Sequence, residues 1–186
     1  EDLKLIKSKK LKKYKNISHG FFKKNGGKSK GIYKSLNCGL GSKDKKVNVL
    51  KNLKIIQNKI GCKKKNLIML HQIHSNKFFY INKNPKRKLV GDGLITKKNG
   101  FALSILTADC APILIYDKKT KMIGAIHAGW KGAYKKIVIK MLKYFLKKKS
   151  RKENIIVAIG PCIAQKNYEI KSDFYRKFIN QDKNNR

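Results

Sequence analysis

A hairpin followed by a helix and a strand constrains the fold more than any other part of the chain. Two β-rich runs, 113–116 and 122–126, flank the polar turn "DKKTK" and predict a β-hairpin. Apolar residues at helical spacing follow in 134–146, and "NIIVAIGP" (154–161) is typical of a buried strand stopped by Gly-Pro. A strand, a helix and a strand in that order form a right-handed parallel crossover, so the sheet is mixed. The predicted fold class is α/β or α+β, with mixed β-sheets flanked by helices.

The rest of the chain shows weaker signals of the same kind. Residues 17–44 contain six glycines and are expected to form loops and turns. Residues 45–60 carry apolar side chains at helical spacing, and Asp44 precedes them as a candidate N-cap. With 186 residues, 41% of them hydrophobic, the chain is expected to form a single domain over residues 1–186. Short strands are expected at 67–70, at 78–81 and within 91–110.

Cysteine usage and hydropathy indicate a cytoplasmic protein without a membrane partner. The four cysteines lie far apart and form no CxxC pair, and no signal-like apolar stretch stands near the first residue. The longest apolar runs are too short to span a bilayer. Free thiols in a reducing compartment are therefore expected. The cysteines are Cys38, Cys62, Cys110 and Cys162.

The net charge of +37 comes almost entirely from lysines scattered along the chain, since only four of the 47 basic residues are arginines. A nucleic-acid binder typically shows a local basic stripe, with arginines at base-reading positions and aromatic residues among them. We therefore expect no specific nucleic-acid partner. Weak, salt-sensitive binding to anionic polymers is expected instead.

The predicted hairpin carries a cysteine at its entry and a histidine at its exit. If the turn is centred between Lys118 and Lys119, Cys110 faces His127, and directly opposed residues have Cβ atoms about 4.5 to 5.5 Å apart. A thiol and an imidazole at that distance can share a metal ion. They can equally form a thiolate-imidazolium nucleophile, or be an inert buried pair.

A metal site needs further ligands, and "LHQIHS" offers His71 and His74. These residues are three apart, so in a strand they face opposite ways and only one can join the site. Two histidines and one cysteine with an open fourth position are typical of a catalytic zinc site, and the same set suits copper. Cys162, which follows Gly-Pro at a strand end, stands where active-site residues of α/β sheets often gather.

Several motifs, taken together and in order, make the chain resemble the laccase-domain family. Its members are named variously polyphenol oxidases and purine nucleoside phosphorylases. The resemblance spans roughly residues 17–172. The motifs are "HGFF" followed by "NGG" and "YKSLNCG", then "QIHS", "TADC" and "HAGWKG", and finally "GPCI" with "YEI".

The resemblance implies a fold, a metal site and activities. It implies the mixed-sheet α/β fold of the family, with zinc or copper held by His74, Cys110 and His127 as catalytic ligands, which leaves His71 outside the site. It also implies phosphorolysis of adenosine, inosine and methylthioadenosine to the free base and ribose 1-phosphate, together with adenosine deamination. The implied partners are small purine nucleosides and phosphate.

Three departures from the family pattern bear on anion binding. Lys131 after Trp130 and Lys24 before "NGG" stand where the family usually has arginine, and lysine lacks the bidentate fork that grips phosphate. Family members also continue beyond this point with Cys-Thr and Tyr-Arg-Arg motifs. The domain is therefore expected to be truncated at its C-terminus, without one anion-binding wall.

Further side chains are weaker candidates for the site. Backbone amides at Gly26 and Gly27, with Lys24 and Lys131, are candidates for a phosphate cradle, although a glycine loop among solvated lysines explains them equally well. Trp130 is a candidate stacking face for the base, or a packing residue. The last candidate, Asp109, precedes Cys110 and points the other way on a strand, which favours indirect support of the metal ligand.

Two other functions compete with this interpretation. Cys110 and His127 alone would suffice for a metal-free cysteine hydrolase. The charge would suffice for an anionic-polymer binding module that has lost catalysis. The histidine count disfavours a true multicopper oxidase, because a trinuclear copper cluster needs more histidines than the four present.

Overall fold

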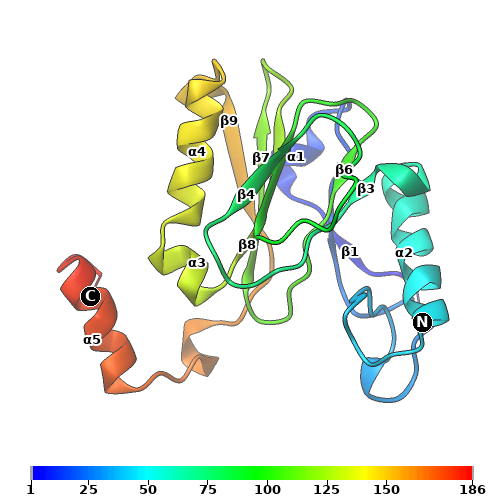
Figure 1. Ribbon diagram of the computed structural model, residues 1–186, viewed down its shortest axis with the longest axis horizontal. Helices are drawn as coiled ribbons and strands as arrows, with labels where there is room; N and C mark the ends of the chain where they lie inside the picture. Colours follow the sequence, from blue (N-terminus) through cyan, green and yellow to red (C-terminus); the bar gives the residue numbers. More distant parts are fainter. Residues whose placement is uncertain (1, 186) are drawn as a thin grey trace.

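The computed structural model describes residues 2–185 and has a five-stranded mixed sheet at its centre (Figure 1). Its strands are β4 (Phe78–Ile81), β5 (Gly93–Thr96), β7 (Ala111–Asp117), β8 (Ile123–Ala128) and β9 (Ile155–Ile159). They lie in the order β4-β5-β8-β7-β9. β4 and β5 are parallel, whereas the other three neighbouring pairs are antiparallel. The predicted mixed sheet is confirmed.

Two small sheets and several helices surround this central sheet. Strands β1 (Leu5–Ile6) and β2 (Phe21–Phe22) pair antiparallel, and β3 (Leu67–Ile68) and β6 (Ala102–Leu103) pair parallel. The α-helices are α1 (Lys9–Lys12), α2 (Lys46–Ile60), α3 (Trp130–Tyr134), α4 (Ile137–Lys147) and α5 (Ser172–Gln181). Four 3-10 turns complete the described elements: η1 (Gly31–Tyr33), η2 (Lys64–Asn66), η3 (Lys152–Asn154) and η4 (Gln165–Asn167).

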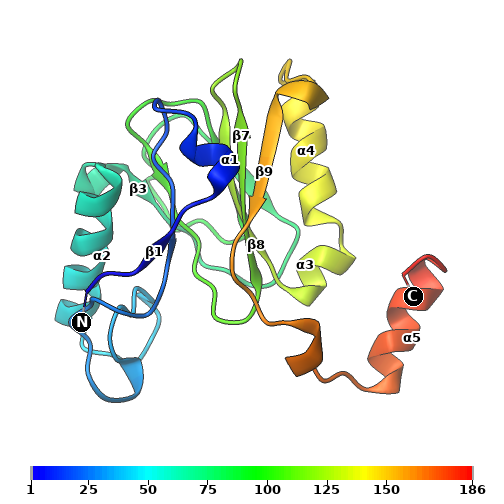
Figure 2. The same ribbon diagram turned by 180° about the vertical axis from the view of Figure 1, so that it is seen from behind.

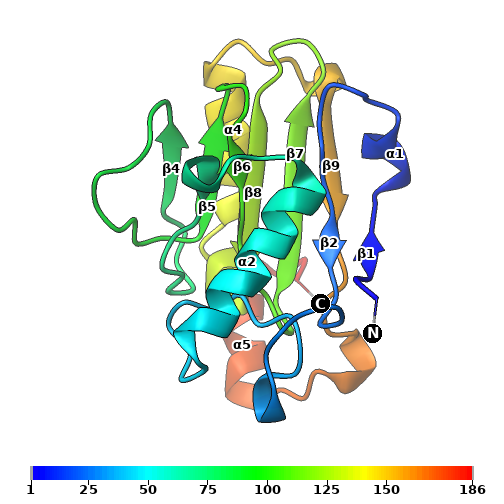
Figure 3. The ribbon, with the colours of Figure 1, turned by 90° about the vertical axis from the view of Figure 1, so that its right-hand side faces the viewer.

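The helices lie on both faces of the central sheet. Helix α4 covers one face, whereas α1 and α2 lie on the other (Figures 2 and 3). The α4 side is sealed by a core that includes Ile126 and Met141, both fully buried. The α1 side is sealed by a second core that includes Leu11 and Tyr116. A sheet covered on both faces gives a rigid edge on which a site can be built.

The crossover between β8 and β9 is the strand-helix-strand unit that the sequence predicts. Both strands are antiparallel to β7, which lies between them, so they are parallel to each other. The connecting helix is not continuous, however. It breaks into α3 and α4 at Lys136, whose φ of +59° is left-handed. The break allows α4 to pack on the sheet while the carbonyl of Lys135, just after α3, accepts a hydrogen bond from the Asn76 amide.

The hairpin of β7 and β8 forms, but its register differs by two positions from the predicted one. His127 pairs with Pro112 and not with Cys110, so the predicted direct opposition is wrong. The cause lies in the turn, where the Asp117 carboxylate accepts hydrogen bonds from two backbone N–H groups at 2.8 and 3.0 Å. These bonds centre the turn one residue later than the sequence alone indicates.

Two local predictions fail for physical reasons. Strand β9 is an edge strand among the described residues, not a buried one: Val157 and Ile159 are 37% and 66% exposed. Asp44 does not cap α2 with its side chain. Its carboxylate instead accepts hydrogen bonds from the Ser29 hydroxyl at 2.6 Å and the Asn37 amide at 3.0 Å.

Within residues 2–185, none of the helices combines the length and the apolar character that a membrane span requires.

Candidate metal centre

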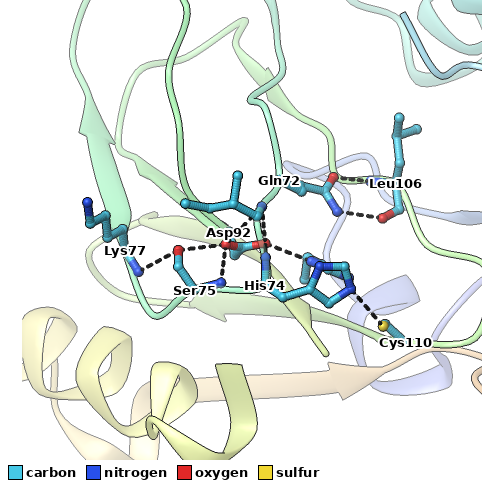
Figure 4. A network of polar contacts seen from close by, with 9 residues as sticks. Gln72, His74, Ser75, Lys77, Asp92, Leu106 and Cys110 are labelled. Atoms are coloured by element: carbon cyan, nitrogen blue, oxygen red, sulfur yellow. Dashed lines mark hydrogen bonds and ion pairs between the residues drawn. The ribbon is translucent and has the colours of Figure 1, made fainter. Parts of the chain in front are cut away.

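Three metal-ligating side chains from distant parts of the chain lie together at the end of the central sheet. His74 comes from the loop before β4, Cys110 from the residue before β7, and His127 from β8. One donor atom of each lies within 4.8 Å of the others, and the described residues contain no second group of this kind. The Cys110 Sγ is 3.7 Å from the His74 Nε2 (Figure 4). The two imidazole rings meet edge to face, with centroids 4.7 Å apart.

The observed register still brings Cys110 and His127 to one face of the hairpin. Continuing the ladder aligns Cys110 with Gly129, and a shift of two positions preserves the alternation of faces. Gly129 must lack a side chain here. A Cβ atom at this position would lie 2.5 Å from the His74 Cδ2 and 3.1 Å from the Cys110 Sγ. The glycine of "HAGW" therefore leaves the space in which the donors converge.

A buried carboxylate lies behind both histidines. Asp92, just before β5, is fully buried, and its Oδ1 accepts hydrogen bonds from the His127 Nδ1 at 2.8 Å and the His74 backbone N–H at 3.0 Å. Its Oδ2 accepts from the backbone N–H and the hydroxyl of Ser75, both at 2.6 Å. Figure 4 shows the carboxylate between these groups.

The segment around His74 is a loop, not a strand. His74 has a left-handed φ of +56°, so the alternation argument that separated it from His71 does not apply. His71 is nevertheless outside the cluster: it forms an isolated bridge with Val90, and the group of converging donors does not include it. Both histidines are exposed, so burial does not distinguish them. The Gln72 amide fixes the other side of the loop through two hydrogen bonds with the Leu106 backbone, each 2.7 Å long.

The charges at the cluster favour a bound cation. Burial, with smaller contributions from the carboxylates of Asp109 and Asp92, raises the pKa of the Cys110 thiol. Burial alone would also raise the pKa of Asp92, but hydrogen bonds from Ser75, His127 and the Ile73 amide outweigh it and lower that pKa. The site thus combines an anionic carboxylate with a thiol that ionises readily only beside a positive charge.

Sequence reasoning missed Asp92. The residue stands in "GDGLIT", between two glycines and directly before a strand whose four residues are all buried. An acidic residue next to a buried strand is unusual, because a buried carboxylate needs several hydrogen-bond donors. Acidic residues are rare in this chain, with 10 against 47 basic ones, so an aspartate directly before a buried strand was the signal that could have identified Asp92.

The glycine loop expected to bind anions packs largely on itself. Gly26 has a left-handed φ of +85° and lies against Leu3, and the Gly27 N–H donates to the Ser35 hydroxyl at 3.1 Å. Residues 26–31 with Lys34 and Ser35 line a hollow of about 420 Å³. A second hollow of about 310 Å³ is bordered by Lys24. Binding of phosphate in this loop stays a prediction.

Trp130 and Lys131 open α3, immediately after Gly129. The Lys131 Nζ lies 5.5 Å from the centroid of the Trp130 ring. Phe174 of α5 packs edge to face on the same ring, with centroids 5.0 Å apart, and Lys177 approaches it to 5.8 Å. The packing role that the sequence left open for Trp130 is therefore present, while base stacking stays a prediction.

Two residues beside Cys110 complete the description. Asp109 is exposed, and the carboxylate that accepts the hydrogen bond from the His127 ring is that of Asp92. Cys162 is exposed on the segment after β9, which runs beside Cys110. The carbonyl of Asp109 accepts from the Ile163 N–H at 3.0 Å, and that of Pro112 accepts from the Gly160 N–H at 2.8 Å.

Fold and cluster together define a laccase-like α/β protein, and comparison with known families agrees. The sequence profile of the family described as multi-copper polyphenol oxidoreductase laccase matches residues 18–186. The chain belongs to this family.

Individual relatives carry a different name. The chain is 33% identical over 191 aligned positions to a purine nucleoside phosphorylase of Bacteroides thetaiotaomicron, with 96% of this chain and 70% of the relative covered. It is 34% identical over 146 positions to one of Rickettsia conorii, with 76% and 60% covered. The crystal structure of a Bacillus licheniformis hypothetical protein, YfiH, is similar with a TM-score of 0.81 and 28% identity, covering 85% of this chain and 63% of that one. The chain thus spans 60 to 70% of the length of these relatives.

Proposed function

We propose that this chain is a metal-dependent purine nucleoside phosphorylase that also deaminates adenosine. The observation that carries the proposal is the convergence of His74, Cys110 and His127 within 4.8 Å. Relatives named purine nucleoside phosphorylases, matched over most of this chain, support the substrate class.

The donor set fits zinc or copper. Two imidazole nitrogens and one thiolate are borderline-soft ligands, and three protein ligands are typical of a catalytic zinc site. When bound, such an ion supplies Lewis acidity, which polarises a substrate group or activates water. A single ion is the appropriate count. Of the four histidines, His19 accepts the Ser8 N–H at 3.0 Å and His71 lies at an isolated bridge, so two remain for the site.

The other side chains would bind and orient the substrates. In phosphorolysis a phosphate oxygen forms a bond to the anomeric carbon of ribose, and the bond to the purine nitrogen breaks. We assign Lys24, Lys131 and the amides of Gly26 and Gly27 to the phosphate. Trp130 would offer its ring to the base.

Proton transfer and water activation complete the proposed chemistry. Asp109, next to Cys110, is the side chain assigned to orienting a ligand or moving a proton. In deamination, water replaces the adenosine amino group, giving inosine and ammonia. We also assign the protein to a reducing cytoplasm, supported by four cysteines that are all unpaired.

The test is incubation of zinc-loaded and copper-loaded protein with adenosine, with and without phosphate, followed by separation of adenine, inosine and hypoxanthine. We expect adenine and ribose 1-phosphate only when phosphate is present, and inosine in either case. His71→Ala serves as the control that retains these activities. Absence of every product from metal-loaded protein would contradict the proposal.

A metal-free cysteine hydrolase predicts a different result. Protein without stoichiometric zinc or copper would then be active and would be inactivated by a thiol alkylator. The raised pKa of the Cys110 thiol disfavours this alternative, because a free thiolate is the nucleophile it requires.

A further inference from the structure

We propose that Asp92 is the positioning residue of the metal centre. Its carboxylate holds the ring of His127 and the backbone of His74 in their ligating arrangement before an ion arrives. This role rests on the metal binding proposed above, whereas the contacts on which it is based are all made between residues of the chain itself.

The first contact fixes the protonation of His127. A neutral imidazole carries one proton, and a carboxylate can only accept, so the bond of 2.8 Å places that proton on Nδ1. The Nε2 lone pair is then free to bind a metal. The Asp92 carbonyl also accepts the His127 backbone N–H at 2.8 Å, which fixes the base of the same side chain.

The second set of contacts fixes His74. The backbone N–H groups of Ile73, His74 and Ser75 all point to the Asp92 carboxylate, at 3.2, 3.0 and 2.6 Å. Successive amides that converge on one anion form a concave anion-binding turn. His74 is left-handed within this turn, a conformation that a non-glycine residue keeps only when its surroundings determine it.

The set of partners around the carboxylate gives a third argument. Asp92 is fully buried, and among residues 2–185 its carboxylate accepts hydrogen bonds from the His127 ring, the Ser75 hydroxyl and the amides of the His74 turn and from no other group. All of these partners belong to the metal ligands or to the turn that carries one of them. An amide of the same shape donates as well as accepts, so it would not dictate the tautomer of His127.

The chain contains a matched control in Asp117. This residue is also a fully buried aspartate, its carboxylate also accepts backbone N–H groups at 2.8 and 3.0 Å, and it lies at the turn end of the same hairpin. The described hydrogen bonds of its carboxylate stay within the turn, and Asp117 is not a member of the His74, Cys110 and His127 cluster. The oxygen of an asparagine amide can accept the same two N–H groups, so Asp117→Asn should keep the turn and the hairpin register while it repeats the chemical change of Asp92→Asn away from the donors.

The experiment measures zinc affinity by competition with a chromophoric chelator, and the visible spectrum of the cobalt-loaded protein. For Asp92→Asn we expect zinc affinity about 10-fold to 100-fold weaker and an altered cobalt spectrum. Asp117→Asn should bind zinc as the unmodified chain does. Zinc affinity unchanged in a folded Asp92→Asn protein would overturn the proposal.

A variant and a measurement cover the remaining outcomes. If Asp92→Asn does not fold, Ser75→Ala is the second variant, because it removes one hydroxyl donor and keeps the carboxylate. We expect its zinc affinity to be weaker by less than about tenfold. No loss of affinity at all would count against the proposal.

Nitrogen NMR of ¹⁵N-labelled histidine in the metal-free protein reports the tautomer of His127 directly. A predominant Nε2–H form in the unmodified chain would refute the positioning role. That result is independent of whether the protein binds metal or has the proposed activity.

Discussion

Two irregular segments of the molecule are each organised by one fully buried polar side chain. Asp92 gathers the turn at residues 73–75, and Asn52 of α2 gathers the glycine-rich loop at residues 28–37. Asn52 accepts from the Lys28 N–H at 2.7 Å and donates to the Asn37 carbonyl at 2.7 Å and the Ser29 hydroxyl at 2.9 Å. The shape of each segment therefore depends on its own buried residue.

Asn52 and Asp92 differ in charge and in the groups to which they are hydrogen-bonded. Asn52 is neutral, and its described partners are backbone groups and one hydroxyl of its own loop. Asp92 is ionised and also holds the ring of His127, a donor that converges with two others. A buried polar side chain therefore indicates a functional site only when its partners are themselves reactive groups. Four substitutions and one pH dependence test this contrast and the assignments built on it.

Replacing Cys110 by alanine should have the largest effect. The variant loses the one sulfur donor of the cluster, so we expect loss of stoichiometric zinc and a fall in phosphorolysis of at least about 100-fold. Metal analysis and product separation check the two readouts. The control is His71→Ala, which truncates a histidine outside the cluster and should keep both zinc content and phosphorolysis. Equal losses in the two variants would show that the cluster is not the metal site.

Replacing Asn52 by alanine should affect stability and not the metal centre. Truncation leaves the Lys28 N–H and the Ser35 and Asn37 carbonyls without their buried partner, at a cost of about 2 to 4 kcal/mol in the free energy of unfolding. Urea denaturation of the metal-free protein measures this. Zinc affinity of the folded variant should not change, and a parallel loss would show that the loop and the metal centre are coupled.

Replacing Gly129 by alanine tests the packing of the cluster. Since the new methyl group would overlap the His74 ring, the donors must separate, and we expect zinc affinity to fall about tenfold with about 1 to 3 kcal/mol of destabilisation. Gly41→Ala is the control, because a Cβ there meets nothing within 4 Å. Unchanged zinc binding in Gly129→Ala would mean that the donors do not need their present spacing.

Replacing Lys131 by arginine tests the phosphate assignment. Arginine presents a bidentate fork that lysine lacks, so the KM for phosphate should fall a few-fold, by about 1 kcal/mol of binding energy, with kcat little changed. The same substitution at Lys97, an exposed position after β5, should have no effect. A KM unaltered by Lys131→Arg would remove this residue from the phosphate site.

The pH dependence of stability should give the smallest signal. Burial opposes ionisation of Asp117, but the nearby Ser150 hydroxyl and the hydrogen bonds from the Thr120 and Lys119 amides outweigh it and lower its pKa. Such a group stabilises the fold above its unfolded pKa, near 3.8, and this contribution is lost as the pH falls through the lower folded value. The stability difference between the unmodified chain and Asp117→Asn should therefore shrink as the pH falls below about 4, as thermal unfolding would measure. A stability difference that grows as the pH falls would show that the pKa of Asp117 is not lowered in the folded protein.

The strands and helices with strong periodicity were predictable, since apolar spacing determines which face is buried. Strands β7 and β8 and helix α4 follow the predicted runs. The register of the hairpin was not predictable, because it depends on the side-chain bonds of Asp117 inside the turn. Likewise, the exposure of β9 depends on what pairs with its outer edge, which its own sequence does not encode.

The candidate site was predictable only in part. Cys110 and His127 reach one face despite the register error, because alternation depends only on whether a shift is even or odd. The choice of His74 over His71 came from family resemblance, and the loop geometry that places it depends on Asp92, 18 residues later in the chain. A contact between two segments that lie far apart in the chain cannot be inferred from the spacing of residues within either segment.

X-ray absorption spectroscopy of the zinc-loaded protein tests the central claim most directly. It reports the elements and distances of the atoms bound to the metal. We predict one sulfur at about 2.3 Å and two imidazole nitrogens at about 2.0 Å, with the sulfur absent in Cys110→Ala. A spectrum without sulfur, one with several sulfurs, or a sulfur that persists in Cys110→Ala would contradict a metal centre formed by His74, Cys110 and His127.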